Sequence, residues 1–371
     1  MPHPPEDFTL GVEEEFQIVD AVDGRLRQGA GRIVTRARRE AGDDVTNELY
    51  LSQIEIGTPV CRTLAEVRDE LRRLRRAVVD AAGKDGCRIA AAGTHPFSHW
   101  HDQDVTPKPR YQGIKDDYQQ LAREQIIFGC HVHVGIADRE AAIQVMNRSR
   151  PWLAVLLALS ANSPYWLGDD TGYASYRTEL FQRFPTAGTP LVFNSRAEYD
   201  ALVDSLVATG SIEDASKIYW DVRPSSHFET IEFRVADVCS DVDEAVMVAA
   251  LSRSLARTCH AEALRGDPIE HARPELLRAA KWRASRFGLD GDLIDVQGRR
   301  AVPAADLVAT FLAYLQPDLE AAREWDEVAH LVAEVQRRGT GARRQRAHFE
   351  AGGQLADVVR AIADETSVGL G

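Results

Sequence analysis

Cysteine is scarce in this chain of 371 residues, and its five cysteines follow no recognisable pattern. They are odd in number, and no two of them have the CxxC spacing of a zinc ribbon or a redox motif. A disulfide framework is therefore not expected, and the cysteine content suits a protein from a reducing compartment.

An excess of positive charge is also lacking. The 57 acidic side chains outnumber the 44 basic ones, which gives a formal net charge of −13 at pH 7. Basic residues do cluster between Arg68 and Arg76, where they indicate the solvated face of a helix. Without a basic block to offset the negative charge, we expect neither a nucleic-acid binder nor a membrane-surface binder.

The chain has no hydrophobic run long enough to cross a membrane. Its most apolar run, WLAVLLALSA from Trp152, is about half of the ~20 residues that a transmembrane helix needs, so it predicts a buried helix. The first residues, MPHPPEDF, lack the basic and apolar regions of a signal peptide. We therefore expect a cytoplasmic protein. The sequence leaves the oligomeric state open, with a homo-oligomer among the allowed states.

What the chain does have is four segments that alternate apolar and polar residues, the period typical of a β-strand with one buried face. The segments are TLGVEEEFQIV from Thr9, SQIEIGTPV from Ser52, GCHVHVGI from Gly129 and HFETIEFRVADV from His227. If the four strands lie in one sheet, one face packs on the core and the other displays a polar set. That set is Glu13, Glu15, Glu55, His131, His133, Glu232 and Arg234.

The polar set suggests a metal site. Any antiparallel sheet with one solvated face alternates in this way, but such faces usually carry Thr, Lys, Arg and mixed charges. Adjacent carboxylates resist joint ionisation unless a cation lies between them, and carboxylate oxygens are ligands that Mg²⁺ prefers. The predicted ligands are Glu13, Glu15, Glu55, Glu232 and His133. Glu14 falls on the apolar face, and we expect it to reach the sheet margin.

From the sequence alone, several of these residues have more than one interpretation. His131 and His133 point the same way on a strand, so they could bind Zn²⁺ with a carboxylate, support a phosphate or form structural hydrogen bonds. Arg234 could be an ion-pair partner of Glu232 or could stabilise charge on a transferring phosphoryl group. The thiol of Cys130 points to the opposite face from the imidazoles, so a Cys–His nucleophile is not expected.

Further basic residues lie outside the four strands. Arg177 and Arg223 lie in or beside predicted loops and could make bidentate contacts with a substrate carboxylate. Lys281, Arg283 and Arg286 fall at a helix end, where composition alone favours a solvated surface. Neither GxxxxGK[ST] nor GxGxxG occurs, so a nucleotide would bind through metal ions and sheet side chains.

The order of the predicted elements favours an α+β protein, with helices packed on one face of an antiparallel sheet and an open polar face. We expect a single domain over 1–371, with the site strands in about 8–236 and a mainly helical part in about 241–371. The TLAE sequence from Thr63 is a capping box that begins a helix. Aromatic-rich loops are expected at 93–114 and 161–190. The predicted helices are 31–41, 64–83, 116–127, 138–150, 198–207, 242–264, 274–286, 303–315, 318–338 and 351–366.

Seven ordered motifs occur within about Phe8 to Gly288, namely GVEEEFQ, QIEIGTPV, GTHPF, GCHVHVGI, NSPYW followed by DTGYASYR, TIEFRVAD and KWRASRFG. They resemble motifs of the glutamate–cysteine ligase type 2 family of ATP-dependent carboxylate–amine ligases. The resemblance implies a glutamine-synthetase-like sheet with an ATP site that uses Mg²⁺, or Mn²⁺ as an alternative. It also implies phosphorylation of a glutamate side-chain carboxylate, then attack by an amine such as cysteine to give a γ-glutamyl amide. The aromatic-rich loops would shield the acyl phosphate from water.

The resemblance assigns roles to positions that the strand pattern singles out. The family's metal-ligand positions are matched by Glu13, Glu15, Glu55 and Glu232. His131 matches the strand histidine near the phosphates, and Arg234 matches the arginine that meets the transferred phosphoryl group. ATP binding is assigned to Lys281, Arg283 and Arg286. His133 stands where longer relatives carry Asn, and the cysteine-binding residues of the longer ligases have no evident counterpart, so the amine stays open.

Two other functions remain to be separated from this one. A Zn²⁺-dependent hydrolase would use the HxH strand with a carboxylate and would need no nucleotide. A non-catalytic nucleotide-binding relative would keep the sheet without turnover, although the intact glutamates and Arg234 argue against it.

Overall fold

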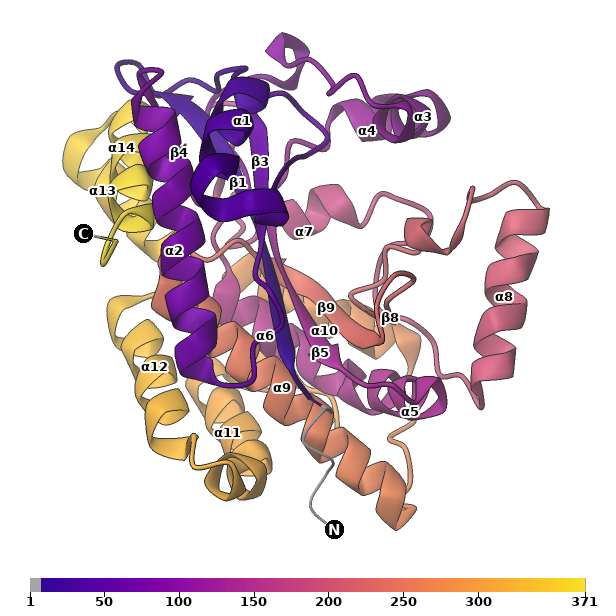
Figure 1. Ribbon diagram of the computed structural model, residues 1–371. Helices are drawn as coiled ribbons and strands as arrows, with labels where there is room; N and C mark the ends of the chain where they lie inside the picture. Colours follow the sequence, from indigo (N-terminus) through magenta and orange to yellow (C-terminus); the bar gives the residue numbers. More distant parts are fainter. Residues whose placement is uncertain (1–7, 371) are drawn as a thin grey trace.

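The computed structural model describes residues 8–370, and Figure 1 traces the chain. The segment 1–7, which contains most of the stretch that argues against a signal peptide, lies outside the described residues. Within 8–370, no helix combines the length and the apolar composition that crossing a membrane requires. The apolar run near Trp152 forms the buried helix α6 (Leu153–Ser160), as predicted.

An antiparallel sheet of seven strands organises the fold, in the order β2-β3-β1-β5-β9-β8, with β4 paired to the end of β1. The four strands predicted from the alternating pattern are β1, β3, β5 and β9, and they are neighbours at the centre of the sheet. Because side chains alternate between the two faces, this arrangement gathers the polar set on one side. The strands are β1 (Leu10–Asp20), β2 (Val45–Asn47), β3 (Gln53–Gly57), β4 (Cys87–Ala90), β5 (Gly129–Gly135), β8 (Val222–Pro224) and β9 (Thr230–Asp237).

Helices cover the apolar face of this sheet. The long helices α2 (Leu64–Gly83) and α9 (Val242–Arg265) pack on it with α5 (Arg139–Ser149) and α6. The predicted capping box of α2 is confirmed, since Thr63 Oγ1 accepts from the Glu66 N–H at 3.1 Å and the Glu66 carboxylate accepts from the Thr63 N–H at 3.3 Å. The helices α3, α4, α7 and α8 lie on the side away from α2 (Figure 1). The predicted α+β class, with an open polar face, is confirmed.

The remaining elements surround this core. The other helices are α1 (Ala30–Ala41), α3 (Pro109–Tyr118), α4 (Gln120–Arg123), α7 (Tyr176–Phe181), α8 (Arg196–Ala208), α10 (Pro274–Phe287), α11 (Ala304–Ala321), α12 (Trp325–Arg338), α13 (Gly341–Gly352) and α14 (Leu355–Thr366). Short 3₁₀ turns are η1 (Gly42–Asp44), η2 (Trp100–Asp102), η3 (Arg150–Trp152) and η4 (Ala215–Lys217). Two small hairpins are β6 (Tyr165–Trp166) with β7 (Asp169–Asp170), and β10 (Asp292–Asp295) with β11 (Arg300–Pro303).

Glu14 does not reach the sheet margin, as its position in the pattern had suggested. It is fully buried on the helical side, where its carboxylate accepts two hydrogen bonds from Arg75 of α2, at 2.8 and 2.5 Å. Arg75 also donates to the carbonyls of Cys239 and Ser240, at 2.9 and 3.1 Å. A buried charge needs such a partner, and α2 supplies it beneath the sheet.

Several predicted boundaries are wrong, including the start of 351–366, where α13 ends at Gly352 and α14 begins at Leu355; two other helices differ for clear local reasons. The helix predicted over 116–127 begins earlier, because Pro109 occupies the first turn of α3, where its missing N–H is not needed. That helix ends at Gln119, whose φ of 47° interrupts it, and the chain is no longer helical after Glu124. The predicted break near residue 316 is absent, since Pro317 lies inside α11.

Candidate active site

The strand register brings the polar set together on the open face of the sheet. Glu13 is paired with His131 across β1 and β5, and His133 is paired with Glu232 across β5 and β9. On the other side of β1, Glu15 is paired with Glu55 of β3. The face is therefore lined with carboxylates and imidazoles from four neighbouring strands.

Three residues on this face form a candidate cation site. Glu13, His133 and Glu232 offer ligand atoms that all lie within 4.8 Å of one another. The Nδ1 atom of His133 is 2.9 Å from Thr230 Oγ1, which orients the ring. Its buried Nε2 lies 3.3 Å from Glu13 Oε1 but is not aligned for a hydrogen bond within the described residues. Two carboxylates and an imidazole nitrogen suit a divalent cation. His131 does not join this group, so the HxH pair does not converge on one ion.

The charge state of this group follows from its contacts. Burial would raise the pKa of Glu13, but His131 and His133 hold it well below its usual range. Burial would likewise raise the pKa of Glu232, but Arg234 and Arg223 lower it. Both carboxylates are therefore ionised at neutral pH, as metal ligands must be. Burial and Arg234 lower the pKa of His131 to about 4, so this imidazole is neutral.

A second group, Glu15, Glu48 and Glu55, carries opposed carboxylates. Burial and Glu48 raise the pKa of Glu15 to about 7. Burial raises the pKa of Glu55 well above its usual range, with contributions from Glu48 and Glu13. Compensation is partial: Arg177 and Arg234 oppose the rise in the pKa of Glu15, the Gly129 N–H donates to Glu15 at 2.6 Å, and Thr46 Oγ1 donates to Glu55 at 3.3 Å. Mutual repulsion of this kind is relieved by a bound cation.

Glu48 is a site residue that the sequence pattern did not reveal. It lies between β2 and β3 in the irregular segment 48–52, where no strand period exists to assign it to a face. Tyr111 of α3 donates a hydrogen bond to its carboxylate at 2.9 Å, and burial raises its pKa. The available signal was a further glutamate close before the Glu55 strand, which alone does not identify a ligand.

Two arginines hold Glu232 from opposite sides. Arg223 of β8 donates from Nε at 2.8 Å, and Arg234 of β9 forms a close ion pair with the other oxygen. Arg223 is fixed further by the carbonyls of Ser216, at 2.9 Å, and Ile218. A bulge in β9 opposite the segment from Cys130 to Val132 changes the register at this point, and bulges near active sites often redirect a side chain.

Arg177 reaches the same face from α7, inside the region predicted as a loop. It is buried, lies 3.8 Å from Asp237, and stacks over Phe181 at 5.5 Å. It lines a cavity of about 100 Å³ together with Glu15, His131 and Arg234. Gly129 permits this approach, since a Cβ atom there would collide with the Arg177 guanidinium.

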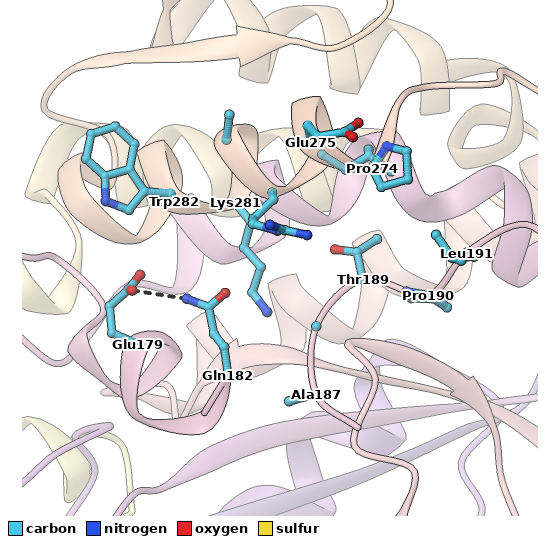
Figure 2. Close-up of a pocket in the computed structure, with 14 residues that line it drawn as sticks. Glu179, Gln182, Ala187, Thr189, Pro190, Leu191, Pro274, Glu275, Lys281 and Trp282 are labelled. Carbon is cyan, nitrogen blue, oxygen red and sulfur yellow. Dashed lines mark hydrogen bonds between the residues drawn. The ribbon is translucent and has the colours of Figure 1, made fainter. Parts of the chain in front are cut away.

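A larger cavity of about 640 Å³ lies between α7, the segment 187–191 and α10 (Figure 2). Lys281 extends into it from α10 and donates to the buried carboxylate of Asp221 at 2.5 Å. Asp221 also accepts from Thr189 Oγ1 at 2.9 Å, and its backbone carbonyl accepts from the Arg234 N–H at 2.8 Å. The cavity is therefore connected to the carboxylate face through β8 and β9.

Arg283 and Arg286 do not line this cavity with Lys281. Arg283 donates to the Asp292 carbonyl at 2.8 Å and lies over Phe287. Arg286 bonds the Gly172 carbonyl and lies 5.6 Å from the Tyr173 ring. They therefore tie α10 to neighbouring segments, and their predicted contact with ATP stays a prediction.

Comparison with known proteins identifies the family. The family model for glutamate–cysteine ligase family 2 matches residues 9–361. A Rhodopirellula baltica protein named "Putative glutamate–cysteine ligase 2" is 44% identical over 96% of this chain and 96% of its own length. The Frankia alni protein named "Putative glutamate–cysteine ligase 2-2" is 45% identical over 97% of each chain.

A solved structure has the same fold. The glutamate–cysteine ligase of Francisella tularensis, solved in complex with AMP, superposes with a TM-score of 0.72 at 14% identity, over 98% of this chain and 90% of its own. Identity this low supports the fold alone. The family match and the identities above 40% confirm the resemblance seen in the motifs, and the chain belongs to the glutamate–cysteine ligase family 2, a family of ligases.

Proposed function

We propose that the protein is an ATP-dependent carboxylate–amine ligase that forms a γ-glutamyl amide through an acyl phosphate. The observation that carries this proposal is the carboxylate face, where the cation group of Glu13, His133 and Glu232 lies beside Arg234. A polyphosphate cannot approach so many carboxylates without cations, whereas with cations present the same face would hold it. Family membership supports ligase chemistry.

Glu13, His133 and Glu232 would hold one Mg²⁺ or Mn²⁺ ion, and Glu15 and Glu55 with Glu48 would hold another. Bound there, these ions would neutralise phosphate charge. The fit rests on the convergence of Glu13, His133 and Glu232 and on the repulsion that remains in the second group.

The first step is phosphoryl transfer. A γ-carboxylate oxygen of glutamate forms a bond to the γ-phosphorus of ATP, while the bond from that phosphorus to the bridging oxygen breaks and ADP leaves. Arg234 is placed to stabilise charge on the transferring group, because Glu232 holds its guanidinium on the carboxylate face. Arg177 and Arg223 would orient the carboxylate substrate.

The second step is amide formation. The amine nitrogen forms a bond to the acyl carbon, phosphate leaves with the bonding electrons, and the nitrogen loses a proton. His131 is suited to accept that proton, since its Nδ1 lies 3.2 Å from Glu13 and a proton held there leaves Nε2 as an acceptor. Its imidazole is neutral at neutral pH but weakly basic, with a pKa of about 4, so this role requires that phosphate charge bound nearby raises the pKa.

The cavity of Lys281 is our candidate for the nucleoside part of ATP. Its volume of about 640 Å³ lies within the range of about 300–1,000 Å³ usual for small-molecule sites. It opens beside the strands that carry Arg223 and Arg234, so a nucleotide bound there would direct its phosphates toward the carboxylate face. Lys281 and Asp221 would then set the position of the cavity wall.

The test detects both the bond from the glutamate carboxylate to phosphorus and the amide bond. Purified protein is incubated with ATP, Mg²⁺, a panel of amines and glutamate labelled with ¹⁸O in its γ-carboxylate, and the products are measured by mass spectrometry. We expect ADP, a γ-glutamyl amide and one ¹⁸O atom in the released phosphate. Glu232→Gln should abolish the products, and Glu350→Gln, on the exposed side of α13, should not. AMP with pyrophosphate, or phosphate without the label, would contradict the acyl phosphate.

The zinc hydrolase alternative is weaker. It needs both imidazoles at one ion, whereas the ligand group in residues 8–370 contains His133 and not His131. Metal analysis of protein purified without chelator separates the two functions, since stoichiometric zinc with no ATP binding would favour the hydrolase.

A further inference from the structure

A third cavity, of about 550 Å³, lies between the start of α3, η4 and the turn that joins β8 to β9. Its lining includes three basic side chains, Arg110, Lys217 and His227. None of these was singled out by the strand pattern or by the family motifs. The cavity belongs neither to the carboxylate face nor to the cavity of Lys281.

Lys217 is unusually placed for a lysine. It is 3% exposed, yet its Nζ makes no hydrogen bond to any of the residues 8–370. The nearest carboxylate oxygen among these residues belongs to Glu213 and is 4.0 Å away, and the Glu213 side chain is 69% exposed. The Lys217 Nζ is not itself fully buried, so it is accessible from the cavity, and partial removal of water from an ammonium is costly unless the ammonium is paired. Lys217 therefore has donors left over for a ligand.

The charged side chains around Lys217 leave its ammonium without a hydrogen-bonded partner in residues 8–370. Asp214 is occupied as the cap of η4, where it accepts from the Ser216 N–H at 2.7 Å. Arg110 contributes a second positive charge, and burial together with Arg110 lowers the pKa of Lys217. Two cations that face the same cavity repel each other, and an anion between them would relieve the repulsion.

The lining of this cavity is linked to the carboxylate face, since Arg110 opposes the rise that burial causes in the pKa of Glu48, and two residues close in sequence to the lining contact that face. Tyr111, next to Arg110, donates to Glu48 at 2.9 Å. Tyr219, just after Lys217 along the chain, lines the small cavity of Glu15 and Arg234. A small molecule that reacts on the carboxylate face could therefore place a second group in this cavity.

We propose that Lys217 and Arg110 bind the α-carboxylate of an amino-acid substrate whose reacting group lies on the carboxylate face. The anion site stands on the geometry of this cavity, and its assignment to a substrate rests on the proposed function. An ammonium and a guanidinium are suited to a carboxylate. The carboxylate comes either from the donor that is phosphorylated or from the amine that attacks.

The binding test observes Lys217 directly. The chain has five lysines, Lys84, Lys108, Lys115, Lys217 and Lys281, so lysine labelled with ¹³C at Cε gives few resonances. Lys217→Met assigns its signal, and Mg²⁺ with a non-hydrolysable ATP analogue is present throughout to prevent turnover. Lys281 is an internal control, since it is equally buried but bonded to Asp221 at 2.5 Å.

Two ligand pairs distinguish the sources of the carboxylate. Glutamate and 4-aminobutyrate differ only in the α-carboxylate, as do cysteine and cysteamine. We expect a saturable shift of the Lys217 signal with the amino acid of one pair and none with its decarboxylated partner. The exposed Arg110→Gln variant should weaken that binding about tenfold, in the range of one charged hydrogen bond.

Kinetics supply an independent readout. Lys217→Met should raise the KM for the same amino acid about tenfold or more, with little change in the KM of its decarboxylated partner and a smaller change in kcat. A purely structural role would instead lower activity with both members of each pair alike, and would overturn the assignment.

The results separate this inference from the proposed function. If the protein forms amides but neither amino acid moves the Lys217 signal, the carboxylate site is wrong and the ligase activity stands. An equal shift with chloride or inorganic phosphate would also overturn it, since the cavity would then bind anions in general. A shift with an amino acid in a protein that forms no amide would retain the site and reject the ligase.

Discussion

Glu15 of β1 and Glu55 of β3 occupy directly paired positions in the sheet, so two half-buried carboxylates face each other, and neither forms an ion pair with an arginine of residues 8–370. The two arginines that share a cavity with Glu15 form their ion pairs elsewhere, Arg234 with Glu232 and Arg177 with Asp237. On this face, arginines neutralise the charge of Glu232, whereas Glu15 and Glu55 repel each other.

Neutralising Glu55 should therefore stabilise the metal-free protein or leave its stability unchanged. Glu55→Gln is nearly isosteric and removes one of the repelling charges, so we expect a melting temperature equal to or slightly above that of the wild type. The stabilisation by Mg²⁺ and ATP should shrink, because a ligand stabilises only through its affinity for the folded state. Turnover should fall more than about 100-fold. Paired thermal melts with an ADP assay measure all three quantities. A clearly lower metal-free melting temperature with an unchanged ligand shift would make Glu55 a structural partner.

Glu14, the residue before Glu15 on β1, should respond in the opposite way to Glu55, since its substitution should destabilise the protein. Glu14→Gln leaves Arg75 buried without its carboxylate, and breaking a buried ion pair from one side costs roughly 3–5 kcal/mol. We expect that loss in urea unfolding, with little change in the Mg²⁺-induced shift of the variant that remains folded. A loss below about 1 kcal/mol would mean that the pair contributes no more than a surface salt bridge.

Much of the contrast between Glu14 and the carboxylates on the open face can be predicted from the sequence alone. The period of two fixes the faces of Glu13 and Glu15 because a strand leaves no other choice, and the same holds for His131 and His133. Glu14 is correctly placed on the other face. Its partner Arg75 is not predictable, because the contact depends on how α2 lies across the sheet.

The site residues that the sequence leaves unplaced lie where no period exists. Glu48 sits in an irregular link between two strands, and Arg177 is brought in by the six-residue helix α7 inside a loop rich in turn residues. Lys217 is held by η4. Such positions are decided by tertiary contacts, so a local period cannot place them on a face of the sheet, although the sequence predicts Arg177 as a substrate contact from its loop.

The contribution of Glu15 to the stability of the metal-free protein should fall as the pH rises toward neutrality. The folded-state pKa of Glu15, about 7, lies above its ordinary value, so the folded protein binds that proton more tightly. The corresponding stability is fully present below the ordinary pKa and is lost as the pH rises through about 7. Glu55 acts in the same direction, since its pKa is raised by burial and by Glu48.

Mg²⁺ should reverse this trend, because it needs the deprotonated carboxylates. Melting temperatures between about pH 5 and about pH 8, with and without Mg²⁺, should diverge as the pH rises. Glu15→Gln should flatten the metal-free curve, and the exposed Glu350→Gln should leave it unchanged. Parallel curves for the wild type with and without Mg²⁺ would show that these carboxylates do not bind the ion.

Arg234 tests the chemical step itself. Arg234→Lys keeps the positive charge beside Glu232 but loses the planar fork that can contact a phosphoryl group with two parallel N–H donors. We expect folding and nucleotide binding to survive, and kcat to fall at least about tenfold, or ~1.4 kcal/mol of barrier. Steady-state kinetics, a thermal melt and nucleotide titration are made on the same preparation, with Arg88→Lys as the control because its pair with Asp364 lies on the surface. A melting temperature that falls together with kcat, while the control keeps both, would assign Arg234 to the support of Glu232 rather than to the transferred phosphoryl group.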